Sequence, residues 1–396
     1  MQSRLILLSY VLLMILTGCN TIERKLDLPN KKPLVPVVNT VELKINWDKK
    51  VVKLRSEDGL NSALLLSKKA DQLFAADVLG NVISLDINGK TLWETSVKEA
   101  ITAGPSIFKD RIYVATATAK LICLSANNGH ILWNTNISSE VLAGLSFSSD
   151  AKIDLVFVHT IDGGLSAINL INGKQLWRFS TAVPNIALRR ASTPVVAGEY
   201  LISGFANGKL FALNKEDAAL LWSYNISNPR GRSELQRMID ISADPIIKNN
   251  TVYAVSYQGN LVAIDLKSGS LLWEQEISSY AGMEIYNNIL YVVAKDGKIF
   301  AIDASNGKTI WTQDELIGRV LSKPVVVAEH VIIGDMDGNL HFLGKRFGQI
   351  KARIFIDSNG ISITPVLDQN NNLLYLLTNS GRLIAVNYVT SSYNNR

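Results

Sequence analysis

The residue types that most often carry metal or acid–base chemistry show no diagnostic spacing in this 396-residue sequence. His130, His159, His330 and His341 form neither an HxH nor an HExxH pattern, the spacings typical of zinc sites. The segment 335–339, DMDGN, has part of a calcium-loop pattern but lacks the closing Glu. The sequence therefore predicts no catalytic residue and no metal site, although an active site whose residues meet only in the fold would leave no such trace.

Cys19, in contrast, follows a recognisable N-terminal segment. Arg4 precedes the apolar run 5–16, which is too short to span a bilayer and is typical of a secretory signal peptide. The run ends in Leu16-Thr17-Gly18-Cys19, which resembles the bacterial lipoprotein signal, where the Cys becomes the lipidated first residue of the mature chain. The resemblance implies a signal peptide at 1–18 and an acyl anchor on Cys19 rather than a membrane span. The alternative is a chance Cys after an ordinary signal peptide.

Residues 20–39 contain several lysines and Pro29, Pro33 and Pro36, without periodicity. We therefore predict that 19–40 form the lipidated Cys and a flexible tether, with a reach of roughly 25 Å as a coil. Asn20 is not the Asp that retains enterobacterial lipoproteins in the inner membrane, so the resemblance implies an outer-membrane anchor facing the periplasm. One further cysteine, Cys123, supplies no disulfide framework and is expected to be a buried strand residue.

The overall composition is that of a globular protein, with 47% apolar and 19% charged residues. The net charge is +5, but the 40 basic and 35 acidic residues are scattered rather than grouped. We therefore expect no nucleic-acid partner.

The chain repeats itself. GNLVAIDLKSGSLLWE at 259–274 returns as GKIFAIDASNGKTIWT at 297–312, and eight copies with a mean spacing of about 43 residues start at Gly80, Ala119, Gly163, Gly208, Gly259, Gly297, Gly338 and Gly381. Alternating apolar residues and turn signals such as Asn207-Gly208 indicate strands joined by tight hairpins. Four strands at this period are typical of a propeller blade, so we predict an all-β, eight-bladed β-propeller of four-stranded antiparallel blades over 41–396.

The tryptophans predict how the ring closes. Six of the seven end copies one to six, at Trp93, Trp133, Trp177, Trp222, Trp273 and Trp311. The eighth copy lacks a final strand, whereas Trp47 follows Val41, Leu43 and Ile45 in strict alternation. We therefore expect 41–47 to be the outer strand of the last blade, so that the chain ends pair and no long edge remains at the seam. We expect each Trp to dock on the neighbouring blade beside a turn Gly with positive φ.

Two families share this Trp-docked blade. The repeats resemble those of the quinoprotein alcohol dehydrogenases, which hold pyrroloquinoline quinone (PQQ) and calcium at the ring centre. That family clamps the quinone under a disulfide between adjacent cysteines, whereas Cys19 and Cys123 are far apart here. We therefore expect no cofactor, and a small PQQ-dependent periplasmic redox enzyme remains the alternative function.

Over its whole length the sequence more closely resembles the BamB family, lipoprotein subunits of the outer-membrane β-barrel assembly machinery. The resemblance implies a non-enzymatic scaffold that binds the periplasmic (POTRA) domains of BamA and assists insertion of outer-membrane proteins. Unfolded precursors of those proteins are a second partner class to consider. A third interpretation, an adhesin or sugar-binding propeller, would place the partner outside the cell.

The segments 186–194 and 233–245 resemble the loops through which BamB proteins contact BamA. The same loops stand out without the family, because the gaps between a Trp and the next copy are longest after Trp222 and next longest after Trp177. Loops lengthened on one face of a rigid scaffold are common binding devices. Together the two loops bring the charged residues Arg189, Arg190, Arg230, Arg232, Glu234, Arg237 and Asp240 to one face.

By this resemblance the expected BamA-binding residues are Ile186, Leu188, Arg189, Arg190 and Asp240. Leu188 is expected to supply apolar anchorage and Arg189 charge-assisted hydrogen bonds. Asp240 is expected either to contact the partner or to brace a nearby Arg. The next acidic position of the family falls on Ser242, with Asp244 two residues on, so this loop departs from the family pattern. The alternative is two tolerated insertions with solvated charges.

Overall fold

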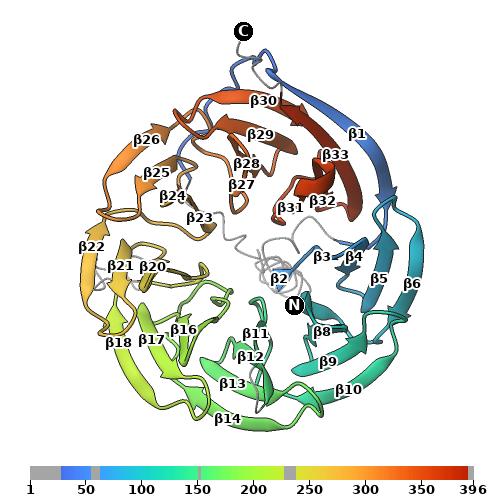
Figure 1. The fold of residues 1–396 in the computed structure, drawn as a ribbon, viewed down its shortest axis with the longest axis vertical. Helices are drawn as coiled ribbons and strands as arrows, with labels where there is room; N and C mark the ends of the chain where they lie inside the picture. Colours follow the sequence, from blue (N-terminus) through green and yellow to red (C-terminus); the bar gives the residue numbers. More distant parts are fainter. Residues whose placement is uncertain (1–27, 55–62, 150–152, 227–237, 391–396) are drawn as a thin grey trace, which may run out of the picture.

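A computed structural model describes residues 28–54, 63–149, 153–226 and 238–390. Within these ranges the chain is all β-strand and loop, apart from the short 3-10 turn η1 (Gln369–Asn371). The strands form eight sheets arranged as blades around a central axis (Figure 1). This confirms the predicted eight-bladed propeller. No helix among the described residues is long and apolar enough to cross a membrane.

The first four blades follow one another along the chain. Blade 1 comprises β3 (Ser67–Lys69), β4 (Gln72–Ala76), β5 (Asn81–Asp86) and β6 (Thr91–Ser96). Blade 2 comprises β7 (Ile101–Phe108), β8 (Arg111–Thr116), β9 (Lys120–Ser125) and β10 (Ile131–Asn136). Blade 3 comprises β11 (Ser146–Ser149), β12 (Asp154–Thr160), β13 (Gly164–Asn169) and β14 (Gln175–Ser180). Blade 4 comprises β15 (Val195–Ala197), β16 (Tyr200–Gly204), β17 (Lys209–Asn214) and β18 (Leu220–Asn225).

The other four blades complete the circle. Blade 5 comprises β19 (Ile246–Lys248), β20 (Thr251–Val255), β21 (Leu261–Asp265) and β22 (Leu271–Gln275). Blade 6 comprises β23 (Gly282–Tyr286), β24 (Ile289–Val293), β25 (Ile299–Asp303) and β26 (Thr309–Gln313). Blade 7 comprises β27 (Val325–Val327), β28 (His330–Gly334), β29 (Asn339–Gly344) and β30 (Ile350–Phe355). Blade 8 comprises β31 (Val366–Asp368), β32 (Leu373–Leu377), β33 (Arg382–Thr390) and the N-terminal strand β1 (Val41–Lys50).

The ring closes as the Trp47 pattern predicts. Strand β1 pairs antiparallel with β33, with Val41 opposite Thr390 and Lys50 opposite Arg382. It is therefore the outer strand of blade 8, and Figure 1 shows it in blue beside the red β33. Because the two ends of the chain pair, the edge of β33 is covered by β1.

Every tryptophan docks on the following blade. The indole N–H of Trp222 donates to the backbone O of Leu266 at 2.8 Å, and the other six make the same bond across their interfaces. The turn whose backbone O accepts the indole N–H contains a residue with positive φ, and the indole ring lies against that residue. A Cβ built on Gly129 would meet the Trp93 ring at 2.5 Å, and where the turn after blade 4's third strand has Ala218 instead, φ is still +62°.

The interface between blades 7 and 8 lacks a tryptophan. Its place is taken by Ala352, which is fully buried. Tyr388 of β33 packs in from the opposite direction, with its ring centroid 6.4 Å from that of Phe342. At this interface an aromatic side chain of blade 8 thus packs where, at the other interfaces, the Trp of the preceding blade packs.

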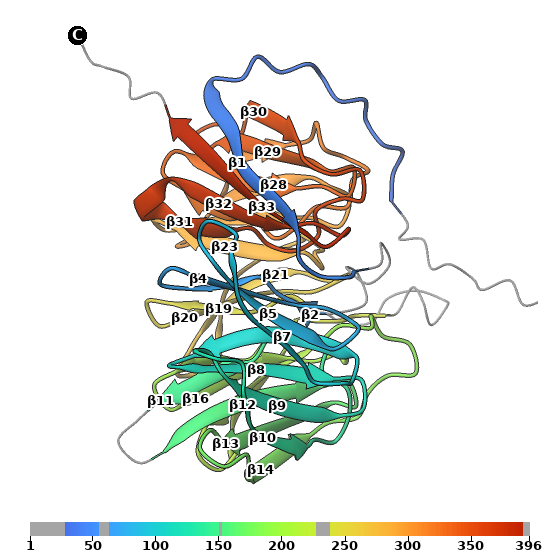
Figure 2. The same cartoon turned by 90° about the vertical axis from the view of Figure 1, so that its right-hand side faces the viewer.

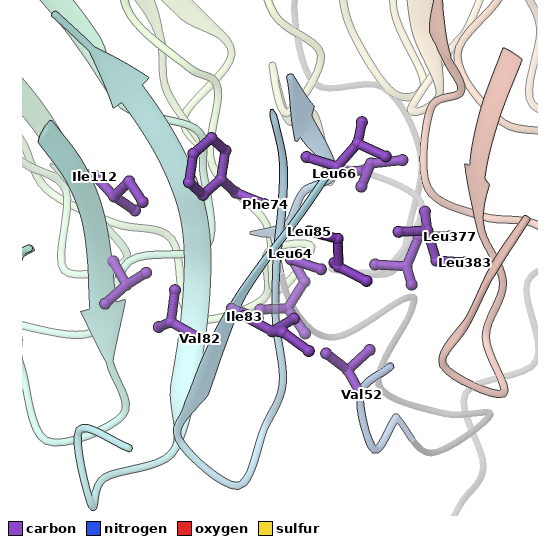
Figure 3. Close-up of a cluster of buried hydrophobic side chains, with 14 of the residues drawn as sticks. Val52, Leu64, Leu66, Phe74, Val82, Ile83, Leu85, Ile112, Leu377 and Leu383 are labelled. Carbon is purple, nitrogen blue, oxygen red and sulfur yellow. The ribbon is translucent and has the colours of Figure 1, made fainter. Parts of the chain in front are cut away.

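Apolar clusters lie between adjacent blades, because the middle strands bury both faces whereas the outer strands bury one. Figure 3 shows part of one cluster, with Phe74 and Ile112 on one side of blade 1 and Leu377 and Leu383 of blade 8 on the other. Cys123 is buried in β9, as predicted.

The sequence did not predict strand β2 (Ala63–Leu64). It runs parallel to β7 near the central axis and gives the blade 2 sheet a fifth strand (Figure 1). The N–H of Leu65 continues the pairing by donating to the O of Gly104 at 2.8 Å.

Candidate partner-binding face

Strand order assigns each connection to one of two faces. Because neighbouring strands are antiparallel, every connection from the outer strand of one blade to the inner strand of the next lies on the same face, which we call the loop face. The turns between first and second strands, and between third and fourth strands, lie on the opposite side, the hairpin face. Figure 2 shows the loop face on the right, where the green connection after β14 projects from the body. The first loop singled out in the sequence, 186–194, and the described part of the second loop, 238–245, lie there as neighbours.

Asp240 braces the first loop from the second. Its carboxyl is 1% exposed, and Oδ2 accepts the backbone N–H of Leu188 at 2.9 Å. Its own backbone O accepts the N–H of Tyr257 at 2.8 Å, which fixes the carboxyl to blade 5. Burial raises the pKa of Asp240 to about 7, against the lowering effects of the Leu188 hydrogen bond and the Arg190 charge.

A second carboxylate makes a similar bond. Asp244 Oδ1 accepts the backbone N–H of Thr193 at 2.7 Å, and the hydroxyl of Thr193 in turn accepts the N–H of Gly144 at 2.9 Å. Ser242, which stands at the family's acidic position, is buried and has no hydrogen-bond partner for its hydroxyl. Asp240 and Asp244, both in the second loop, thus hold the backbone of the first loop.

Leu188 lies on an apolar cluster assembled from several connections. The buried members Met238, Tyr257 and Tyr280 come from the connection before β19, the β20–β21 hairpin and the connection before β23. Half-buried side chains pack against them: Ile186, Leu188, Ala281 and Val320. Leu188 therefore has one side fixed on this loop-face cluster and the other side toward solvent, as an apolar anchor requires.

Arg189 is the exposed cation of the first loop. Its side chain is 61% exposed, and Nη2 pairs with the better buried Glu140 at 2.6 Å. Arg190 is half-buried. Burial raises the pKa of the nearby Tyr280 phenol to about 12, and the charge of Arg190 opposes this rise. Arg230, Arg232, Glu234 and Arg237 lie outside the described residues.

His159 is hydrogen-bonded to the first loop as well. It is 3% exposed, and its Nδ1 lies 2.9 Å from the backbone O of Ser192. Burial lowers the pKa of His159 to about 4, so the imidazole is neutral at physiological pH and donates this bond. The cavity beside it has a volume of about 20 Å³, room for about one water molecule. Within the described ranges, no three His, Cys, Asp or Glu residues come close enough to hold a metal ion.

The N-terminal segment reaches the same face, which the sequence did not predict. Lys31 pairs with Asp337 and Lys32 with Asp314, both at 2.7 Å, and the N–H of Lys32 donates to the O of Ile317. Further along, Arg353 Nη1 donates to the O of Val35 at 2.8 Å. The described part of the expected tether, residues 28–40, thus lies along blades 6 and 7 (the blue trace in Figure 2).

Comparison with known proteins places this geometry in a family. The family model described as "Outer membrane protein assembly factor BamB" matches residues 79–313 and 283–395. The chain belongs to the BamB family. Curated members from Yersinia pestis and Moranella endobia are each 30% identical to it, covering 93% and 91% of this chain and 95% of either relative. A member from Kangiella koreensis is 32% identical and covers 85% of both chains.

Solved structures agree with this membership of the BamB family. The crystal structure of BamB from Moraxella catarrhalis superposes with a TM-score of 0.78 at 25% identity, covering 87% of this chain and all of the other. The quinohemoprotein alcohol dehydrogenase from Comamonas testosteroni superposes with a TM-score of 0.68 at 10% identity, covering 92% of this chain and 79% of the other. At that identity the likeness shows a shared fold alone, so the comparisons favour BamB over the quinoprotein alternative.

Proposed function

We propose that this chain is a non-enzymatic scaffold subunit of the outer-membrane β-barrel assembly machinery, and that its loop face binds the periplasmic domains of BamA. Membership of a family named for outer-membrane protein assembly supports the role. The observation that supports the loop face as the binding surface is the hydrogen bond between the two loops, in which buried Asp240 holds the backbone of Leu188. A loop held in place before binding loses less conformational entropy when the partner docks.

The braced loop presents two complementary groups. Leu188 offers an apolar side chain above the loop-face cluster. Arg189 offers a guanidinium that is 61% exposed beside the better buried Glu140, which leaves it accessible to a partner carboxylate. Ile186 and Arg190 extend the same surface, whereas Asp240 acts from below it. Such an apolar centre with a charged rim is typical of protein interfaces.

The N-terminal segment supports a shared orientation of anchor and loops. We propose that Cys19, outside the described residues, carries the lipid that holds the chain to the periplasmic side of the outer membrane. Residues 31 and 32 are bound on the loop face, so only the short stretch between Cys19 and Lys31 separates the anchor from that face. The partner surface and the anchor would then lie on the same side of the propeller, near a membrane-embedded partner.

Affinity measurements on the soluble chain from Asn20 onward test this function. Binding to the periplasmic domains of BamA from the same organism should fall at least about tenfold for Leu188→Glu and for Arg189→Ala. Matched controls on exposed residues elsewhere, Leu272→Glu and Arg346→Ala, should bind like the wild type. Absence of binding by the wild type, or equal losses in the controls, would reject the proposed loop face.

A further inference from the structure

The N-terminal segment changes the face from which the chain leaves the propeller. Strand β1 starts at the hairpin face, because Val41 lies opposite Thr390 at the hairpin-face end of β33. From there, residues 40 back to 31 run along the outside of blade 7 to the loop face, where Lys31 and Lys32 are bound (Figure 2). We call residues 28–40 the strap. With the strap docked, the chain N-terminal to it leaves from the loop face, and with the strap released it leaves from the hairpin face.

Arg353 of β30 holds the middle of the strap. Its backbone N–H donates to the side-chain O of Asn39 at 2.9 Å, and its backbone O accepts the Asn39 side-chain amide at 3.1 Å. Its Nη1 donates to the backbone O of Val35 at 2.8 Å, and its Nε donates to Nδ1 of His341 at 3.1 Å. Arg353 thus joins the strap to the interior of blade 7.

These bonds require His341 to be neutral. Because an arginine Nε only donates, His341 Nδ1 must accept and carries no proton. The proton is therefore on Nε2, which donates to Oδ2 of Asp335 at 2.8 Å. His341 and Asp335 are both fully buried. The chain of hydrogen bonds from Asp335 through His341 and Arg353 to Val35 cannot survive a second proton on the imidazole, since that proton would face the Arg353 N–H.

A histidine at this place is specific to blade 7. In every blade, the residue that follows the Trp position pairs with one residue of the third strand, which in blade 7 is His341. In the other seven blades the third-strand residue is apolar or a serine: Ile83, Ile122, Ser166, Phe211, Val262, Phe300 and Ile384. Of these eight described side chains, that of His341 alone can change its charge between pH 5 and pH 8.

The charges around His341 determine the direction of its pH response. Asp335 lies in the β28–β29 turn, Arg353 on β30 and Arg319 in the connection before β27, and around them lie Asp337, Glu315 and Lys31. Burial lowers the pKa of His341 below the ordinary 6.5, and the charges of Arg353 and Arg319 add to this against the effect of Asp335. Moving Arg353 away removes one of these cations, so the released state binds a proton more tightly and acid favours release.

We propose that Asp335, His341 and Arg353 form an acid-sensitive latch on the strap, and that this latch determines from which face of the propeller the N-terminal anchor leaves. With the latch closed, the anchor and the loop around Leu188 are on the same side. A proton from solvent on His341 Nδ1 displaces Arg353, which gives up Val35 and moves the exit of the chain to the hairpin face. The proposal rests on the lipid anchor and the loop face proposed above.

Double electron–electron resonance on the soluble chain from Asn20 onward measures the latch. Spin labels are attached to Asn30→Cys on the strap and to Phe347→Cys on the hairpin face, whereas Cys123 is buried and is not labelled. The wild type should give one narrow distance distribution at pH 7.5 and an added broad one at pH 5. The ratio of released to docked strap should rise about tenfold, as expected when protonation is about tenfold more favourable in the released state.

Three variants isolate the histidine. His341→Asn presents an amide oxygen to Arg353 but cannot ionise, so it should keep the narrow distribution at both pH values. Arg353→Met removes both side-chain hydrogen bonds and should give the broad distribution at both. His130→Asn, at an exposed histidine of blade 2, is the matched control and should behave like the wild type. Asp240 titrates over the same range in all of these chains, so it cannot cause a difference between them.

The outcome is independent of the proposed partner, because no BamA is present in the measurement. An unchanged wild-type distribution between pH 7.5 and pH 5 would overturn the proposal. So would equal broadening in wild type and His341→Asn, or a strap that stays docked in Arg353→Met.

Discussion

A turn on the hairpin face and a pair of loops on the loop face are held by aspartates that act over different ranges. On the hairpin face, Asp265 accepts the N–H groups of Lys267 and Ser268, its neighbours within one turn. On the loop face, Asp240 and Asp244 accept the N–H groups of Leu188 and Thr193, which are 52 and 51 residues distant. The local bonds recur from blade to blade and maintain the scaffold, whereas the long-range bonds belong to one pair of loops and shape one surface. Repetition therefore marks what stabilises this chain, and departure from it marks where partners are expected.

The largest expected effect concerns the repeated contacts. Trp222→Ala should lower the free energy of unfolding by about 3–5 kcal/mol, because it removes a buried ring from between blades 4 and 5 together with its bond to Leu266. Denaturant unfolding of the soluble chain measures this. Phe347→Ala, at a side chain 64% exposed on the hairpin face, should stay within about 0.5 kcal/mol of the wild type. A similar loss for both would mean that the indole contacts are not what holds the blades together.

Asp240 gives the loop face a pH dependence. Its pKa rises from the ordinary 3.8 to about 7 on folding, so the folded state binds this proton more tightly than the unfolded state does. The resulting stability is fully present below about pH 4 and is lost as the pH rises through 7, by up to about 4 kcal/mol. Asp240→Asn keeps an oxygen for the Leu188 N–H but cannot ionise.

Unfolding curves from pH 4 to pH 8 should therefore show wild type losing stability relative to Asp240→Asn as the pH rises. Asp240→Ala, which leaves the Leu188 N–H without an acceptor, should lose about 1–3 kcal/mol relative to Asp240→Asn. The same variant should bind BamA domains more weakly than Asp240→Asn does. Parallel pH profiles for wild type and Asp240→Asn would contradict the buried brace.

The regular parts of this fold could be predicted because they rest on periodicity. Trp47 and its alternating neighbours indicated both the outer strand of blade 8 and its pairing with β33. The braces could not be predicted, because Asp240 and Leu188 lie in loops without periodicity and meet only once the blades are stacked. Strand β2 is two residues long, too short to leave a pattern. The sequence predicts only a tether for residues 28–40, because the residues that they contact, Asp314, Asp337 and Arg353, lie near the other end of the chain.

The smallest expected effect concerns that N-terminal segment. Replacing Lys31 and Lys32 together with Ala should change global stability by less than about 1 kcal/mol, because both ion pairs are exposed. Hydrogen exchange of the Lys32 N–H, which donates to Ile317, should nevertheless accelerate, and salt should produce the same change in the wild type. Lys44→Ala with Lys50→Ala, on the exposed side of β1, is the matched control and should not affect that exchange.

The most direct measurement of which face meets BamA is photocrosslinking in intact cells. A photoreactive residue is introduced in place of Leu188 on the loop face, or in place of Phe347 on the hairpin face. The proposed function predicts an adduct with BamA from position 188 and none from position 347. An adduct from position 347 but not from 188 would contradict the assignment of the loop face as the partner-binding surface.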